Sequence, residues 1–139
     1  YCSAYIYWYL KRFYCLMGDT DKRSPTSEGE ITKNGYIMAH YAQYATETTR
    51  IKAVTNNEEV CATAYWDEKT GEVTIVLLNL NGASQWLEIP LAGIKKASAV
   101  ETNETKNMEV IDTGLMESAE GITVLLSANS ITSVRLTFK

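Results

Sequence analysis

The longer part of the chain, residues 49–139, consists of short β-prone segments that are separated by turn residues and show no helical period. The most informative segment is VTIVLLNL at residues 73–80, because its nearly continuous apolar character is typical of a central strand buried on both faces. Further segments of this kind lie at residues 50–55, 60–66, 85–89, 97–102, 109–112, 122–127 and 130–138. Short strands with turns about every 8–12 residues predict a mainly β fold, an antiparallel β-sandwich of about eight strands.

Turn residues between these segments support the same pattern. Asn81 and Gly82 follow the central segment and give a strong turn signal. Pro90 ends the next segment, where its missing N–H does least harm to a strand. Asn129 and Ser130 lie between the last two segments and predict a hairpin turn there.

Residues 1–48 differ from the rest of the chain in composition. They hold eight of the nine tyrosines, and their basic and acidic residues balance, whereas the net charge of −4 comes from residues 49–139. This change predicts two domains, 1–48 and 49–139.

The first domain reads as a strand, a loop and a helix. β-branched and aromatic residues at 4–9 favour a strand, and polar residues with glycine and proline at 18–29 favour a surface loop. Residues 33–45 place apolar side chains at helical spacing, and Thr32 or Asn34 could cap that helix. Because such a unit cannot cover its own faces, it must pack on the sandwich, on a second copy of itself, or on a larger domain.

Charge and composition argue against several classes of partner. An acidic pI near 5.0 and the lack of a basic stripe argue against nucleic acid. No apolar run approaches the roughly 20 residues of a transmembrane helix, so we expect no membrane partner. Because the chain begins at Tyr1 without an initiator methionine or a signal peptide, we expect it to be a piece of a longer protein.

No metal or cofactor is expected. Cys2, Cys15 and Cys61 lack the spacing of a zinc site or a disulfide framework, which favours free, partly buried thiols. The sequence also has no glycine-rich phosphate loop and no EF-hand pattern.

Two stretches of the first domain carry a family resemblance. AYIYWYLKRFY at residues 4–14 and EITKNGYIMAHYAQYA at residues 30–45 resemble the end of the catalytic domain in glycoside hydrolase family 30, above all its bacterial glucuronoxylan-cleaving xylanases. The resemblance implies that residues 1–48 are the last β-α unit of a truncated (β/α)8 barrel, or TIM barrel. It also implies that residues 49–139 are the β-sandwich side domain that follows the barrel, and that the parent protein is secreted.

The same resemblance implies roles for four residues. Trp8 and Tyr9 would face xylose rings, Arg12 would pair with the carboxylate of the glucuronate branch of xylan, and Tyr14 would hydrogen-bond to that carboxylate. Aromatic rings do stack well on the apolar faces of sugars, and arginine makes strong charge-assisted bonds with carboxylates. In this family a glycine is often found at the position of Cys15.

The resemblance places both catalytic glutamates upstream of residue 1, so we expect no activity from this chain alone. Glycoside hydrolysis needs two carboxyl groups held about 5–10 Å apart. The pairs of glutamates in the chain resemble solvated surface instead; they are Glu58 with Glu59, Glu101 with Glu104, and Glu117 with Glu120. His40, the single histidine, is expected to have a packing or hydrogen-bonding role within the helix.

Trp66 and Trp86 leave two interpretations open. On one exposed face of the sandwich they would form a sugar platform, whereas in the interior they would simply pack.

Three hypotheses for the whole chain follow. It is a non-catalytic C-terminal fragment of a xylan-degrading hydrolase, a free-standing carbohydrate-binding module for xylan or a related plant polysaccharide, or a module that self-associates through the apolar segment at residues 4–9.

Overall fold

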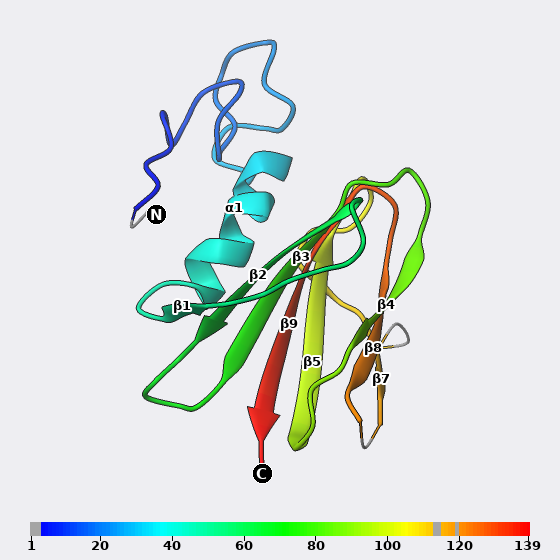
Figure 1. Cartoon of the computed structure of the whole chain (residues 1–139). Coiled ribbons are helices and arrows are strands. Elements are labelled where there is room, and N and C mark those ends of the chain that lie inside the picture. The colour runs from blue at the N-terminus through cyan, green and yellow to red at the C-terminus, as the bar shows by residue number, and fades with distance from the viewer. Residues whose placement is uncertain (1–3, 113–114, 119) are drawn as a thin grey trace. The chain divides into compact units, whose positions relative to one another are not determined.

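The computed structural model describes residues 4–112, 115–118 and 120–139 (Figure 1). The chain divides into two compact units, Tyr1–Ala39 and His40–Lys139. The boundary falls inside the helix α1 (Lys33–Tyr44), so that helix contributes residues to both units.

The second unit is an antiparallel β-sandwich of two sheets, as the sequence predicts (Figure 1). In the larger sheet the strands follow the order β1 (Thr49–Ile51), β2 (Val60–Trp66), β3 (Val73–Asn79), β9 (Ser130–Phe138), β5 (Ile94–Thr102) and β6 (Glu109–Val110). The smaller sheet has the order β4 (Gln85–Ile89), β8 (Ile122–Leu126) and β7 (Leu115–Glu117).

The core of the sandwich lies between the two sheets. Central strand β3 is buried on both faces, with Leu77 directed to the core and Val76 to the opposite face. Val124 and Leu126 of β8 meet it from the smaller sheet and are fully buried. Burying a side chain of this size contributes about 1.5–3 kcal/mol, so this layer supplies much of the stability of the fold.

The turn at Asn129 differs from the predicted hairpin. Asn129 has a positive φ of 45°, and the hydroxyl of Ser130 donates a hydrogen bond to the carbonyl of Ser127 at 2.7 Å. However, β8 and β9 belong to different sheets, so this turn carries the chain from one layer to the other. The prediction of a hairpin was wrong because turn residues specify a local reversal, whereas the sheet that a strand joins depends on its burial pattern.

Helix α1 begins at the predicted residue and ends one residue before the predicted end. Thr32 is its N-cap, since the backbone N–H of Gly35 donates to the Thr32 hydroxyl at 3.3 Å. Gly35 is required here: a Cβ at this position would lie 2.3 Å from the carbonyl oxygen of Leu16. The helix therefore starts in close backbone contact with the segment before it.

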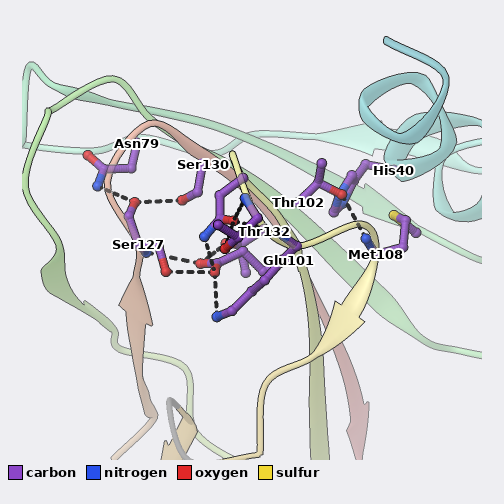
Figure 2. Close-up of polar contacts among 11 residues, drawn as sticks. His40, Asn79, Glu101, Thr102, Met108, Ser127, Ser130 and Thr132 are labelled. Carbon is purple, nitrogen blue, oxygen red and sulfur yellow. Dashed lines mark hydrogen bonds and ion pairs between the residues drawn. The ribbon is translucent and has the colours of Figure 1, made fainter. Parts of the chain in front are cut away.

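The structure gives His40 the packing and hydrogen-bonding role that the sequence predicts. It is fully buried, and its Nδ1 lies 2.8 Å from the Ser133 hydroxyl. Its Nε2 lies 3.0 Å from the hydroxyl of Thr102, and Figure 2 labels both of these side chains. Burial lowers the pKa of His40 to about 4, an effect that the negative charge of Glu101 partly offsets. Within the second unit, a neutral imidazole thus fixes the end of the helix, residues 40–44, to the outer face of the larger sheet.

Glu101 contradicts the expectation that it is solvated surface, because it is fully buried. On β5 it lies two residues after the core residue Ala99, on the same face of the strand, and so points between the sheets. Its carboxylate accepts hydrogen bonds from the Ser127 N–H at 2.9 Å and from the Ser127 hydroxyl at 2.7 Å (Figure 2). It also pairs with the Lys106 ammonium at 2.9 Å. Burial raises the pKa of Glu101, but the Ser127 hydrogen bonds and the Lys106 charge outweigh it and leave the pKa below its ordinary value.

The predicted strand at residues 4–9 is not formed: the structure has no regular secondary structure at residues 4–10. A strand needs a neighbouring strand, and the described part of the first unit offers only single bridging pairs, Lys11 with Met17 and Met17 with Ile31. The loop at residues 18–29 is confirmed, and two backbone bonds close it, Gly18 N–H to Glu30 O at 2.8 Å and Gly29 N–H to Gly18 O at 3.0 Å.

Candidate carbohydrate-binding residues

Three of the four residues expected to bind sugar lie together in the first unit. The ring centroids of Trp8 and Tyr9 are 4.2 Å apart, and the Cζ atom of Arg12 lies 5.4 Å from the Tyr9 centroid. Trp8 is 70% exposed and Tyr9 38% exposed, and the peptide bond between them is cis. We refer to Trp8, Tyr9 and Arg12 as the aromatic cluster. It combines two accessible rings with a cation, a set of groups suited to an acidic sugar.

Tyr14, the fourth expected residue, lies outside the aromatic cluster. Its ring packs edge-on against Phe13 with centroids 4.8 Å apart, and it is 41% exposed. Its carbonyl oxygen accepts hydrogen bonds from the Tyr7 hydroxyl and from the Asn34 side-chain amide, both at 3.1 Å.

A tight turn supports the aromatic cluster from its backbone side. The N–H of Tyr9 donates to the sulfur of Cys15 at 3.2 Å, and the N–H of Cys15 donates to the carbonyl of Arg12 at 3.0 Å. The hydroxyl of Thr32 donates to the carbonyl of Cys15, which joins this turn to the capped start of α1. The sequence predicts the helix cap, but contacts through a cysteine sulfur have no sequence signal.

The charges around the aromatic cluster are largely paired. Lys11 forms an ion pair with Glu28 at 2.5 Å, and Arg23 forms one with Asp21 at 2.7 Å. The hydrogen bonds from Arg23 hold the pKa of Asp21 well below its usual value. Arg12, in contrast, forms no ion pair with any residue that the structure describes, so its guanidinium can receive an external carboxylate.

Trp66 and Trp86 stand on different sheets of the sandwich. Trp66 ends β2 and is 41% exposed, whereas Trp86 lies on β4 and is 50% exposed. No ring contact joins the two within the described ranges. Each therefore offers a separate exposed ring.

A groove of about 790 Å³ opens beside Trp86 in the second unit, and the sequence did not predict it. It lies between residues 51–57 and residues 86–91, and its floor is formed by inner-face side chains of β2 and β3. Aliphatic residues such as Val54 and Leu77 dominate the lining. The groove contains no pair of carboxyl groups arranged for glycoside hydrolysis, since Glu88 is the one acidic residue in its lining.

Within the described residues, no three histidine, cysteine or acidic side chains are grouped so that they could hold a metal ion. None of the helices formed by these residues is long and apolar enough to cross a membrane. Cys15 and Cys61 are free thiols, but neither is partly buried as the sequence favoured, since Cys15 is buried and Cys61 exposed. Cys2 lies outside the described residues.

Two curated relatives match most of the chain. It is 29% identical over 135 residues to glucuronoxylanase XynC of Bacillus subtilis strain 168, a match that covers 94% of this chain and 29% of the relative. It is 30% identical over 111 residues to a second glucuronoxylanase XynC of Bacillus subtilis, covering 77% of this chain and 24% of that relative. The chain thus spans less than a third of the length of these relatives. No protein-family model matches it.

Solved structures show the same fold. The family 30 xylanase C from Talaromyces cellulolyticus matches with a TM-score of 0.75 at 15% identity, over 88% of this chain and 27% of that one. The family 30 subfamily 8 xylanase Xyn30A from Clostridium acetobutylicum matches with a TM-score of 0.71 at 18% identity, over 88% of this chain and 30% of that one. A family 51 arabinofuranosidase from Xanthomonas axonopodis pv. citri also matches, with a TM-score of 0.65 at 15% identity, over 88% and 29%.

The structural matches establish the fold and nothing more specific, because they include enzymes from two different glycoside hydrolase families. The sequence matches go further, since both relatives are glucuronoxylanases and one of them aligns with nearly the whole chain. This chain is accordingly related to the xylanases of glycoside hydrolase family 30, and the resemblance seen in its sequence is confirmed.

Proposed function

We propose that this chain is the C-terminal part of a xylan-degrading glycoside hydrolase, an endo-1,4-β-xylanase of the glucuronoxylanase type. Residues 1–48 supply the last β-α unit of the barrel and part of the sugar cleft, and residues 49–139 supply the side domain. The observation that carries this proposal is the match of 94% of the chain to 29% of a glucuronoxylanase. By the same relationship the parent protein is secreted and acts on xylan or glucuronoxylan.

The aromatic cluster supports a role in substrate binding. The exposed rings of Trp8 and Tyr9 can stack on the apolar faces of xylose units. The guanidinium of Arg12 has no ion-pair partner among the described residues and can form a charge-assisted fork with a glucuronate carboxylate. In this proposal the Tyr14 hydroxyl adds a hydrogen bond to the same carboxylate.

The chain itself is proposed to be non-catalytic. Glu101, the buried carboxylate of the sandwich, is occupied by Ser127 and Lys106 and cannot reach a substrate. The two catalytic glutamates that the family resemblance implies would come from the barrel that precedes this segment.

A chimaera tests this proposal. The matching segment of the Bacillus subtilis glucuronoxylanase is replaced by this chain, and the release of reducing sugar from glucuronoxylan is measured. We expect a folded chimaera to cleave glucuronoxylan, whereas the 139-residue chain alone should release no sugar. A folded chimaera without activity, or hydrolysis by the isolated chain, would contradict the proposal.

The second candidate function is a free-standing carbohydrate-binding module. It is favoured by the exposure of Trp66 and Trp86 on the sandwich. Affinity electrophoresis of the 139-residue chain in gels that contain soluble glucuronoxylan tests it. Retardation that is lost in Trp66→Ala or Trp86→Ala would support this function, and migration equal to that in a polysaccharide-free gel would reject it.

A further inference from the structure

Cys15 lies at the centre of the contacts that hold the aromatic cluster. It has no solvent exposure, although the rings of Trp8 and Tyr9 that it supports are exposed. Its sulfur accepts the hydrogen bond from the Tyr9 N–H at 3.2 Å. A thiol is a weak acceptor, but this bond is partly buried, and an N–H in such a place loses the free energy of a hydrogen bond when no acceptor is in reach.

The backbone of Cys15 is fixed on both sides of that sulfur. Its N–H donates to the carbonyl of Arg12 at 3.0 Å, and its carbonyl accepts the hydroxyl of Thr32. Thr32 also caps α1 through the Gly35 N–H. The thiol therefore lies at a defined place relative to the start of the helix. Because it accepts the hydrogen bond from the Tyr9 N–H, it also holds the backbone of Tyr9 at a defined distance from the helix.

We propose that Cys15 is a positioning residue for the aromatic cluster. Its thiol fixes the backbone of Tyr9, and the turn that Cys15 closes fixes the backbone of Arg12. Together these contacts set the spacing of the Trp8 and Tyr9 rings and keep the guanidinium above the Tyr9 ring. The contribution of Cys15 to sugar binding rests on the proposed function, whereas its contact with Tyr9 does not.

Substitutions at Cys15 separate the acceptor from the space that it fills. Cys15→Ala removes the acceptor and leaves a small void, and Cys15→Val fills the space without an acceptor. Cys15→Ser keeps an acceptor in place of the sulfur. Cys61→Ala is the matched control, because Cys61 is exposed on β2 and lies in the other unit.

The first measurement is amide hydrogen exchange at Tyr9, followed by NMR in the 139-residue chain. Loss of one hydrogen bond should speed exchange about fivefold in the alanine and valine variants. Cross-relaxation between the Trp8 and Tyr9 rings should weaken in the same variants. The serine variant and Cys61→Ala should exchange at Tyr9 within about twofold of the wild type.

Folding is checked in each variant from the dispersed amide resonances of helix α1. Faster Tyr9 exchange in either folded variant that lacks the acceptor supports the positioning role. Unchanged exchange and unchanged ring contacts in a folded Cys15→Ala or Cys15→Val chain overturn it, as does a serine variant that behaves like alanine.

The second measurement is kinetic and uses the glucuronoxylanase chimaera. Cys15→Ala should raise KM for glucuronoxylan about fivefold with little change in kcat, and Cys15→Ser should restore KM. If the wild-type chimaera is folded and inactive while Tyr9 exchange responds to Cys15→Ala, the proposed function fails and the positioning role stands. If the chimaera is active and Cys15→Ala changes neither Tyr9 exchange nor KM, the positioning role fails and the proposed function stands.

Discussion

Arg12 differs from the basic residues near it in what its guanidinium contacts. Lys11 and Arg23 each pair with a carboxylate of the chain, although Arg23 also lies over the ring of Phe13. Arg12 lies over the ring of Tyr9 and has no carboxylate partner among the described residues. The contact with a ring face uses none of the hydrogen-bond donors of a guanidinium, so those of Arg12 remain available to a ligand. This arrangement makes Arg12 the residue whose removal should change the selectivity of binding.

The Arg12→Ala substitution in the chimaera should lower kcat/KM on glucuronoxylan about 10- to 100-fold, since a hydrogen bond to a charged group contributes about 1.5–3 kcal/mol. On xylan without glucuronate the loss should stay below about threefold, because no charged bond is removed there. Initial rates on the two substrates give this comparison, and Lys22→Ala serves as a control for an exposed cation. Equal losses on both substrates would exclude uronate binding by Arg12.

His40 makes the stability of the fold depend on pH. Its pKa is about 4 in the folded protein and about 6.5 when it is exposed, so the unfolded state binds more protons between these values. The free energy of unfolding should therefore fall as the pH falls from about 6.5 to 4, by at most about 3 kcal/mol. Urea unfolding across this range measures the decrease.

The matched variant for this measurement is His40→Gln, which keeps hydrogen-bonding groups but does not titrate. It should show a flatter pH dependence between about pH 6.5 and 4.5 than the wild type. Glu101 titrates differently: with its pKa below its ordinary value of 4.5, its stabilisation is lost only as the pH falls below that value. Identical slopes in wild type and variant would refute the role of His40.

At the scale of the elements, the prediction of strands succeeded where burial alternates or is continuous. Strands β2, β4 and β9 have the predicted bounds, and β3 has the predicted burial on both faces. The three-residue strand β7 was missed because a segment this short shows no period. The predicted strand at residues 4–9 failed for a different reason, since β propensity cannot supply the neighbouring strand that pairing requires.

Glu101 illustrates a further limit at this scale. Its burial depends on Ser127, which arrives from the end of β8, and on Lys106, which follows β5. Neither partner is adjacent in sequence, so a glutamate in a polar stretch reads as surface. The carboxylate connects the larger sheet to the chain that leaves the smaller one.

Replacing Glu101 with glutamine should therefore lower the free energy of unfolding by about 2 kcal/mol at neutral pH, because charge-assisted bonds are exchanged for neutral ones. Urea unfolding measures the change. Glu104→Gln, at the exposed neighbour, should change stability by less than about 0.5 kcal/mol. Similar small changes in the free energy of unfolding at both positions would show that the charge of the buried Glu101 carboxylate does not stabilise the fold.

At the scale of the whole molecule, the first unit exposes an unusual amount of apolar surface. Tyr5 is 70% exposed, Ile6 90% and Leu10 64%, all within one short segment. Such surface is covered in stable proteins by another domain or another chain. In the proposed function, the barrel that would precede this segment covers that surface, and the assignment of residues 1–48 to a barrel rests on the family resemblance alone.

The isolated 139-residue chain should consequently self-associate through residues 4–10. Size-exclusion chromatography with light scattering should show a mass above that of a monomer, increasing with concentration. A double variant, Ile6→Glu with Leu10→Glu, should shift the mass towards the monomer. Val54→Glu changes an equally exposed residue of the sandwich and should leave the mass unchanged. A strictly monomeric wild type would disprove this expectation.

The position of the unit boundary within α1 has a practical consequence for anyone who wishes to express the sandwich by itself. A cut at residue 48, where the composition changes, would discard His40 and leave the hydroxyls of Thr102 and Ser133 without the ring that they contact. A shortened protein that starts at Thr32 retains both the capped helix and the buried imidazole of His40. Truncation design for this domain should therefore follow the packing of the helix.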